Sequence, residues 1–173
     1  MLKTFVAQAF VIPSESMYPT LKIGDRVVVS RVSYDLHEPN RGDVVVFPNP
    51  RLEATDHSAY PLRILHEILQ GVGVRRPPEQ ELIKRIIGLP GETIEGRDGQ
   101  VWIDGRPLSE PYLQPGVRTD NLVLTVLPAG RVFVMGDNRG DSSDSRVFGP
   151  VAVSTIVGRA LFRAWPPARV AFL

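Results

Sequence analysis

The fold is decided by one apolar run, Leu82-Ile83-Lys84-Arg85-Ile86-Ile87-Gly88-Leu89-Pro90-Gly91. Its β-branched residues, and the Gly and Pro residues that end it, are typical of a buried strand followed by a turn. Lys84 stands inside this strand, where burying a positive charge is costly. The strand therefore marks both a core element and a candidate for chemistry.

Further runs rich in Val and Ile, bounded by Pro and Gly, predict a mainly β protein with antiparallel sheets. These runs cover residues 26–32, 43–47, 101–104, 121–127, 131–135 and 156–163. Asp98-Gly99 and Asp104-Gly105 flank one of them, and Asp-Gly favours tight hairpin turns. We expect a catalytic core from residues 1–92 and 132–173, with a small β-hairpin lobe at 93–131.

One segment has helical spacing. Between residues 60 and 74, apolar side chains recur every three or four positions, with polar side chains opposite. This pattern predicts one short amphipathic helix. Its flanks are typical of loops, so residues 49–81 are interpreted as an insertion between two core strands.

Composition excludes several classes of function. The 173 residues suffice for one folding unit, and the net charge of +1 provides no basic stripe for nucleic acid. The absence of cysteine excludes disulfides, zinc-thiolate sites and cysteine nucleophiles. The acidic segment 137–144 does not fit an EF-hand, because Ser142 and Phe148 stand where Gly and Glu are required. We expect neither a metal nor a cofactor.

A second stretch, Pro13-Ser14-Glu15-Ser16-Met17-Tyr18-Pro19-Thr20-Leu21, places a serine in a turn bracketed by prolines. A serine hydroxyl needs a base to become a nucleophile. The three histidines, His37, His57 and His66, fall in turn, loop and polar helix positions. This disfavours a Ser-His-Asp triad and leaves Lys84 as the candidate base.

Lys84 can act as a base only when it is neutral. From its ordinary pKa, only on the order of one lysine in a few thousand is neutral at pH 7, so burial must lower the pKa by roughly two units or more. Strand alternation leaves two orientations open. Either Lys84 faces inward, or it faces solvent while Arg85 faces inward or is paired.

The chain resembles the bacterial type I signal peptidases, membrane-bound serine endopeptidases with a Ser-Lys dyad. Four blocks carry the resemblance in order: residues 13–21; 24–29; 41–47 leading to 83–85 and 88–91; and 136–139 with residues 142, 144, 145 and 146. The resemblance implies the antiparallel β core that this family shares with self-cleaving repressors.

The resemblance also implies roles for individual residues. Ser16 is the implied nucleophile and Lys84 the general base. Ser14 joins the Ser16 backbone N–H in the oxyanion hole. Ser142 orients the lysine, and Asp144 and Arg146 form a supporting charge pair.

The implied substrates are signal peptides of secreted preproteins, cleaved after small residues at −1 and −3. The peptide would lie as an extended strand beside the motif strands. Its shallow apolar pockets would be lined by Phe10, Ile12, Pro13, Met17, Leu21, Leu82 and Ile83.

The implied location is the plasma membrane, with the catalytic domain on the extracytoplasmic side and against the lipid bilayer. Residues 1–12 are too few to cross a bilayer, so we expect the N-terminal transmembrane anchor to be absent from this chain. Two alternatives stay open. One is another Ser-Lys peptidase of this fold, for pilin maturation or self-cleavage. The other is a non-catalytic module that binds extended peptides.

Overall fold

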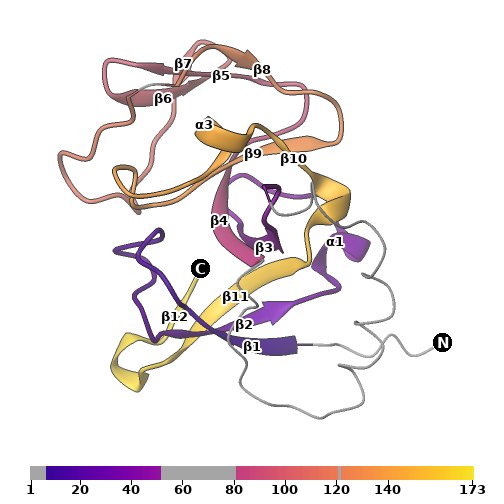
Figure 1. Ribbon diagram of the computed structural model, residues 1–173, viewed down its shortest axis with the longest axis vertical. Helices are drawn as coiled ribbons and strands as arrows, with labels where there is room; N and C mark the ends of the chain where they lie inside the picture. Colours follow the sequence, from indigo (N-terminus) through magenta and orange to yellow (C-terminus); the bar gives the residue numbers. More distant parts are fainter. Residues whose placement is uncertain (1–6, 52–80, 121) are drawn as a thin grey trace.

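The structure is a computed structural model that describes residues 7–51, 81–120 and 122–173 (Figure 1). Every strand pair in it is antiparallel, so the predicted mainly β fold is confirmed. The strands are β1 (Ala7–Val11), β2 (Arg26–Ser30), β3 (Val44–Pro48), β4 (Glu81–Gly88), β5 (Thr93–Arg97), β6 (Gln100–Ile103), β7 (Arg106–Pro107), β8 (Thr125–Val126), β9 (Arg131–Met135), β10 (Val151–Ala152), β11 (Gly158–Trp165) and β12 (Ala171–Phe172). The helical turns are α1 (Ser33–Leu36), α3 (Ser145–Phe148), η2 (Val153–Thr155) and η3 (Pro167–Arg169).

The larger sheet has eight strands in the order β1-β2-β11-β3-β4-β9-β10, with β12 added to β11. Its first five strands enclose one apolar cluster. Phe10 of β1, Val46 of β3 and Ile83 of β4 are all buried in it. Because the first and fifth strands of the order share this core, the sheet is strongly coiled, and β1 and β4 lie on opposite sides of the same cluster.

The smaller sheet has the order β7-β6-β5-β8 and lies above the larger sheet in Figure 1. Both predicted hairpin turns are present, because Asp98-Gly99 and Asp104-Gly105 adopt positive φ at each residue. The predicted strand at 121–127 is shorter than expected, since β8 covers only residues 125 and 126.

The core beneath the smaller sheet is continuous with the larger sheet. It contains Ile94 and Val101 of the smaller sheet together with Ile87 of β4 and Phe133 of β9. Because the two sheets share these apolar contacts, the division into a core and a separate lobe at 93–131 stays a prediction.

The predicted helix at 60–74, and residues 52–80 of the predicted insertion, lie outside the described residues. Among the residues that are described, no helix has the length and apolarity required to cross a membrane.

Candidate active site

Lys84 and Arg85 are both buried, with exposed fractions of 2% and 6%. They point to opposite faces of β4, as alternation along a strand requires. Both faces are covered, because the neighbouring β4 residues Ile83 and Ile86 are buried in two different apolar clusters. Of the two orientations left open by the sequence, the inward one holds for Lys84, and Arg85 is paired as well.

The side chain of Lys84 ends at Ser16. Its Nζ lies 2.7 Å from Ser16 Oγ and also donates to the backbone oxygen of Ile83 at 3.0 Å. Burial lowers the pKa of Lys84 from 10.5 to about 8, while the charges of Asp144 and Asp137 act in the opposite direction. A neutral amine at this distance can accept the proton of the serine hydroxyl.

The loop that carries Ser16 is closed at its base and fixed at its tip. At the base, Ile12 N donates to Asp25 O at 2.8 Å, and Gly24 N donates to Ile12 O at 2.9 Å. At the tip, Asn138 N donates to Ser16 O at 3.0 Å. Backbone hydrogen bonds of this kind fix the serine relative to the loop after β9.

Ser14, the predicted oxyanion-hole serine, lies beside the nucleophile. The two hydroxyl oxygens of Ser14 and Ser16 are 3.4 Å apart. Ser14 is exposed and Ser16 half-buried, so a substrate carbonyl can approach both from solvent.

Ser142 is held close to the nucleophile loop by a glycine. A Cβ on Gly136 would collide with Ser142 Oγ and with the backbone oxygen of Ser16. The Ser142 hydroxyl is buried and acts on Asp144, whose pKa it helps to lower by hydrogen bonding. The hydrogen bonds of Lys84 in this part of the chain go to Ser16 and Ile83, so the lysine-orienting role of Ser142 stays a prediction.

Asp144 and Arg146 form the charge pair that the sequence predicted to support this loop. Asp144 is fully buried, and its carboxylate accepts from both Nε and Nη2 of Arg146 at 2.9 Å. It also caps α3 and accepts from Gly136 N at 3.0 Å. Burial raises the pKa of Asp144, but the hydrogen bonds from Arg146 and Gly136 outweigh it and hold the pKa below its ordinary value.

The predicted pocket residues divide into three groups. Pro13 is exposed, and Leu82 packs against the cluster on the other face of β4. The remaining five share the core cluster enclosed by the first strands: Phe10, Ile12, Met17, Leu21 and Ile83. Ile83 is the most accessible of these, with 9% of its surface exposed, and it adjoins the dyad in the sequence.

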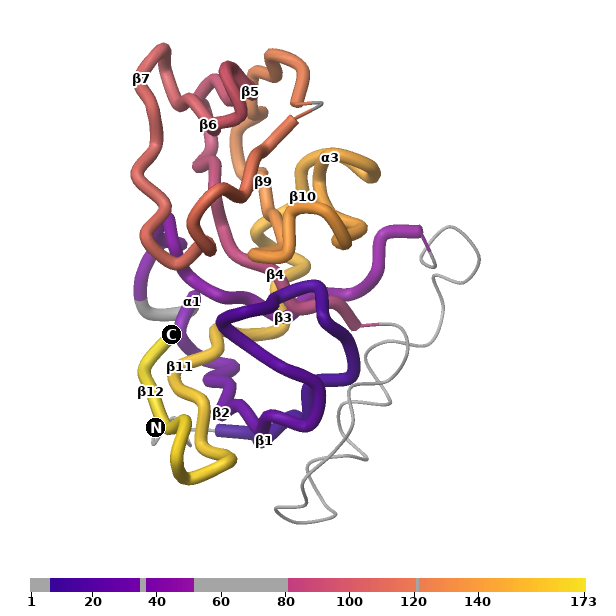
Figure 2. Tube along the Cα trace, turned by 90° about the vertical axis from the view of Figure 1, so that its left-hand side faces the viewer, coloured from indigo at the N-terminus to yellow at the C-terminus, as the bar shows by residue number. Residues whose placement is uncertain are grey.

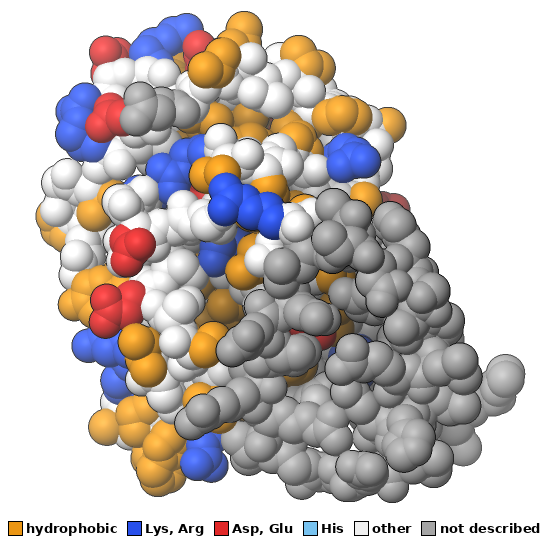
Figure 3. All heavy atoms as spheres, in the orientation of Figure 1, with side chains coloured by type: hydrophobic (Ala, Val, Ile, Leu, Met, Phe, Trp, Pro, Cys, Tyr) orange, Lys and Arg blue, Asp and Glu red, His pale blue; other side chains and the backbone are white. Residues whose placement is uncertain are grey.

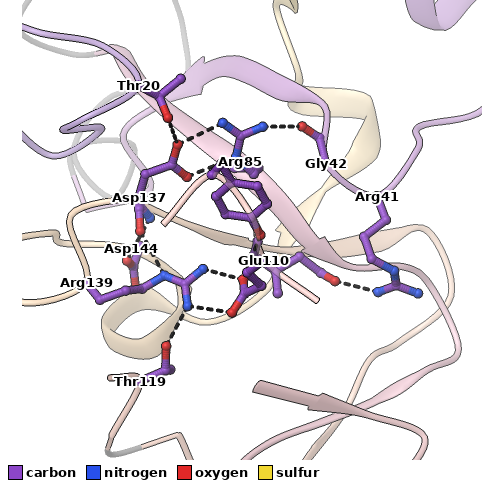
Figure 4. Close-up of polar contacts among 12 residues, drawn as sticks. Thr20, Arg41, Gly42, Arg85, Glu110, Thr119, Asp137, Arg139 and Asp144 are labelled. Carbon is purple, nitrogen blue, oxygen red and sulfur yellow. Dashed lines mark hydrogen bonds and ion pairs between the residues drawn. The ribbon is translucent and has the colours of Figure 1, made fainter. Parts of the chain in front are cut away.

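Sequence reasoning assigned no role to Asp137, although this residue connects β4 with the nucleophile loop. Its carboxylate accepts two hydrogen bonds from Arg85, at 2.9 and 2.8 Å, and a third from Thr20 Oγ1 at 2.5 Å (Figure 4). Its position after a buried strand, in a Gly-Asp-Asn-Arg sequence, was the only available signal.

Comparison with known proteins identifies the family of this chain. Residues 1–165 match the family described as signal peptidase, peptidase S26. The chain is 44% identical to a probable signal peptidase I-1 of Synechocystis, covering 98% of this chain and 76% of that protein. It is 37% identical to a signal peptidase I of Mycobacterium tuberculosis, covering 96% and 67%.

A solved structure is also similar. The crystal structure of a signal peptidase I from Enterococcus faecalis matches with a TM-score of 0.50 and 31% identity, covering 71% of this chain and 97% of that one. The sequence match extends over nearly the whole chain, and the structural match covers most of it. This chain therefore belongs to the signal peptidase S26 family.

Proposed function

We propose that this chain is a serine endopeptidase that removes N-terminal signal peptides from exported proteins, with Ser16 as nucleophile and Lys84 as general base. The observation that carries the proposal is the 2.7 Å contact between Lys84 Nζ and Ser16 Oγ, formed by a lysine that is 2% exposed. Membership of the signal peptidase family supports the choice of substrate.

The chemistry is acyl transfer to water. Ser16 Oγ attacks the scissile carbonyl while Lys84 takes the hydroxyl proton, and the oxyanion accepts hydrogen bonds from Ser14 Oγ and the Ser16 backbone N–H. When the resulting tetrahedral intermediate collapses, Lys84 donates the proton to the leaving amine, and the acyl group stays on Ser16 as an ester. Lys84 then takes a proton from the water that attacks the ester, and gives it to Ser16 Oγ as the carboxylic acid product leaves.

An extended substrate strand fits the strand edges near the dyad. Pairing of β4 with β9 begins at Arg85, so within the described residues no strand pairs with residues 82–84 on that side of β4. Strand β1 likewise pairs only with β2 in this part of the chain. A peptide added along these edges would present its carbonyl to Ser16 by main-chain hydrogen bonding.

The pockets favour small side chains. Met17 and Leu21 are 1% and 0% exposed, so the apolar cluster beside the dyad is already filled by the protein. A substrate side chain packed against this filled cluster would have to be small, as the proposed residues at −1 and −3 are. Larger residues would have to displace close-packed core atoms.

A membrane surface is the proposed site of action. Trp165, Val170 and Phe172 are 48%, 58% and 90% exposed, and apolar side chains gather at the lower left of Figure 3, where β11, η3 and β12 lie. The same region touches the nucleophile loop, because Arg169 pairs with Asp25 at 2.8 Å. Contact of these side chains with lipid would bring the active site to membrane-bound substrates.

The test is cleavage of a preprotein in detergent or lipid by the parent chain and by Ser16→Ala and Lys84→Ala variants. Each variant should lose activity by at least about 10³-fold while remaining folded. Ser154→Ala, an exposed serine in η2, is the matched control and should cleave like the parent. Retention of most activity by either dyad variant would refute the mechanism.

A further inference from the structure

A segment that connects two strands of the smaller sheet reaches back to the active site. Between β7 and β8 the chain descends to the level of β4 before returning, as Figure 2 shows. This segment carries three polar residues, Glu110, Tyr112 and Thr119, that contact buried arginines of the catalytic core. None of the three has a part in the acyl-transfer chemistry.

The first set of contacts runs through Arg139, which is 3% exposed. Glu110 accepts two hydrogen bonds from its guanidinium, at 2.5 and 3.1 Å, and Thr119 Oγ1 accepts a third at 2.5 Å. On its other side, Arg139 Nε donates to Gly136 O at 3.0 Å. Gly136 is the glycine that packs against the backbone of Ser16, so these contacts connect Glu110 to the nucleophile.

The second set runs through Arg85. Tyr112 donates its hydroxyl proton to Glu110 at 2.6 Å, and its ring lies 4.1 Å from the guanidinium carbon of Arg85. Arg85 holds the carboxylate of Asp137, which in turn accepts the hydroxyl of Thr20 in the nucleophile loop (Figure 4). Both sets therefore start at Glu110 and end on the loop that carries Ser16.

The charges in this network are balanced. Two buried arginines, Arg85 and Arg139, face two buried or nearly buried carboxylates, Asp137 and Glu110. Removing one partner of a buried ion pair leaves the other charge uncompensated, and the surrounding structure shifts to relieve it. A shift of about 1 Å at a reacting group can cost roughly 10²-fold in rate.

We propose that Glu110 and Tyr112 are positioning residues for the Ser16–Lys84 dyad, acting through Arg139 and Arg85. The inference rests on the proposed function, because it concerns the rate of the same reaction. The segment between β7 and β8 would then affect catalysis indirectly, by holding the dyad in place and not by contact with the substrate.

The first experiment compares Glu110→Gln with the parent chain in steady-state cleavage of a signal-peptide substrate. We expect kcat to fall between about tenfold and 100-fold while KM stays within about twofold, because the dyad is displaced but the substrate strand is not. A merely structural role would lower the melting temperature and leave kcat of the folded protein unchanged.

Glu92→Gln is the matched control. Glu92 also forms an ion pair with an arginine, Arg41, at 2.5 Å, but Arg41 donates to Ile87 O and not to the nucleophile loop. This variant should keep the parent kcat. A folded Glu110→Gln variant with kcat within about twofold of the parent would overturn the proposal.

A second pair of variants keeps the proposal testable should Glu110→Gln fail to fold. Tyr112→Phe keeps the ring over Arg85 and should retain most of kcat, whereas Tyr112→Leu removes the ring and should lower it at least about tenfold. Combining Tyr112→Leu with Thr20→Val should give a non-additive loss, since both act on one network. Equal kcat for the Phe and Leu variants, or full additivity with Thr20→Val, would refute the proposed connection.

Failure of this inference is distinguishable from failure of the proposed function. If the parent chain cleaves, Ser16→Ala does not, and Glu110→Gln matches the parent, only the positioning role is wrong. If Ser16→Ala cleaves like the parent, the proposed function is wrong and the positioning role fails with it.

Discussion

The lowered pKa of Lys84 predicts the pH dependence of catalysis in the free enzyme. With a pKa of about 8, roughly one tenth of the Lys84 side chains are neutral at pH 7, compared with about one in 3,000 at the ordinary value of 10.5. Burial therefore supplies a gain of about 300-fold in the amount of active base. Because only the neutral amine accepts the serine proton, kcat/KM should rise about tenfold per pH unit below pH 8 and level off above it.

The assay measures initial rates from pH 6 to pH 10 at constant ionic strength, with substrate well below KM and without groups that ionise in this range. Asp144→Asn should move the midpoint to lower pH, because the charge of Asp144 stabilises the ammonium form of Lys84. Asp141→Asn, an exposed residue in the same loop, is the control and should leave the midpoint in place. A parent profile that is flat between pH 7 and pH 9, or that has its midpoint near pH 10.5, would refute the reasoning.

Further predictions concern stability and close packing. Lys84→Met should abolish cleavage yet raise the free energy of unfolding at pH 7 by about 1 kcal/mol or more. The pKa of Lys84 is lower in the native than in the unfolded protein, so below pH 8 the buried amine lowers stability by about 3 kcal/mol, and this cost fades as the pH rises from 8 to 10.5. The substitution removes the cost, but it also removes the two hydrogen bonds of Lys84, which offsets part of the gain. Gly136→Ala should abolish cleavage, because its Cβ would displace Ser142 and the Ser16 backbone, whereas Gly140→Ala, with open space at the Cβ position, should cleave normally. Asp137→Asn should lower the free energy of unfolding in urea by about 3 to 5 kcal/mol, because it leaves Arg85 without its partner. A loss below 1 kcal/mol, or an equal loss for the exposed Asp120→Asn, would contradict that account.

The elements that could be predicted from the sequence are those fixed by local patterns. The β-branched run before Gly88 predicts β4, and the Asp-Gly pairs at 98–99 and 104–105 predict the turns of the smaller sheet. In each case the determining residues lie within a few positions of one another. The pairing of Ser16 with Lys84 came from the family resemblance, because the two residues lie far apart in the chain and no local pattern connects them.

The orientation of Lys84 could not be predicted from alternation, because the pattern assumes one buried and one exposed face. Strand β4 is covered on both faces, so Lys84 and Arg85 are both buried. The role of Glu110 was equally hidden. Its partner Arg139 lies on another segment, and no rule of spacing connects the two.

The adjacency of Lys84 and Arg85 makes catalysis depend on how β4 is threaded into the sheet. A one-residue slip against β3 would exchange the two faces of the strand. It would bring to Ser16 a guanidinium, which stays protonated at every physiological pH and cannot act as a base. Gly88 opposes such a slip, since a Cβ at its position would meet the side chains of Leu127 and Phe133. A protein misthreaded in this way would keep its apolar composition in the core and have no catalytic base.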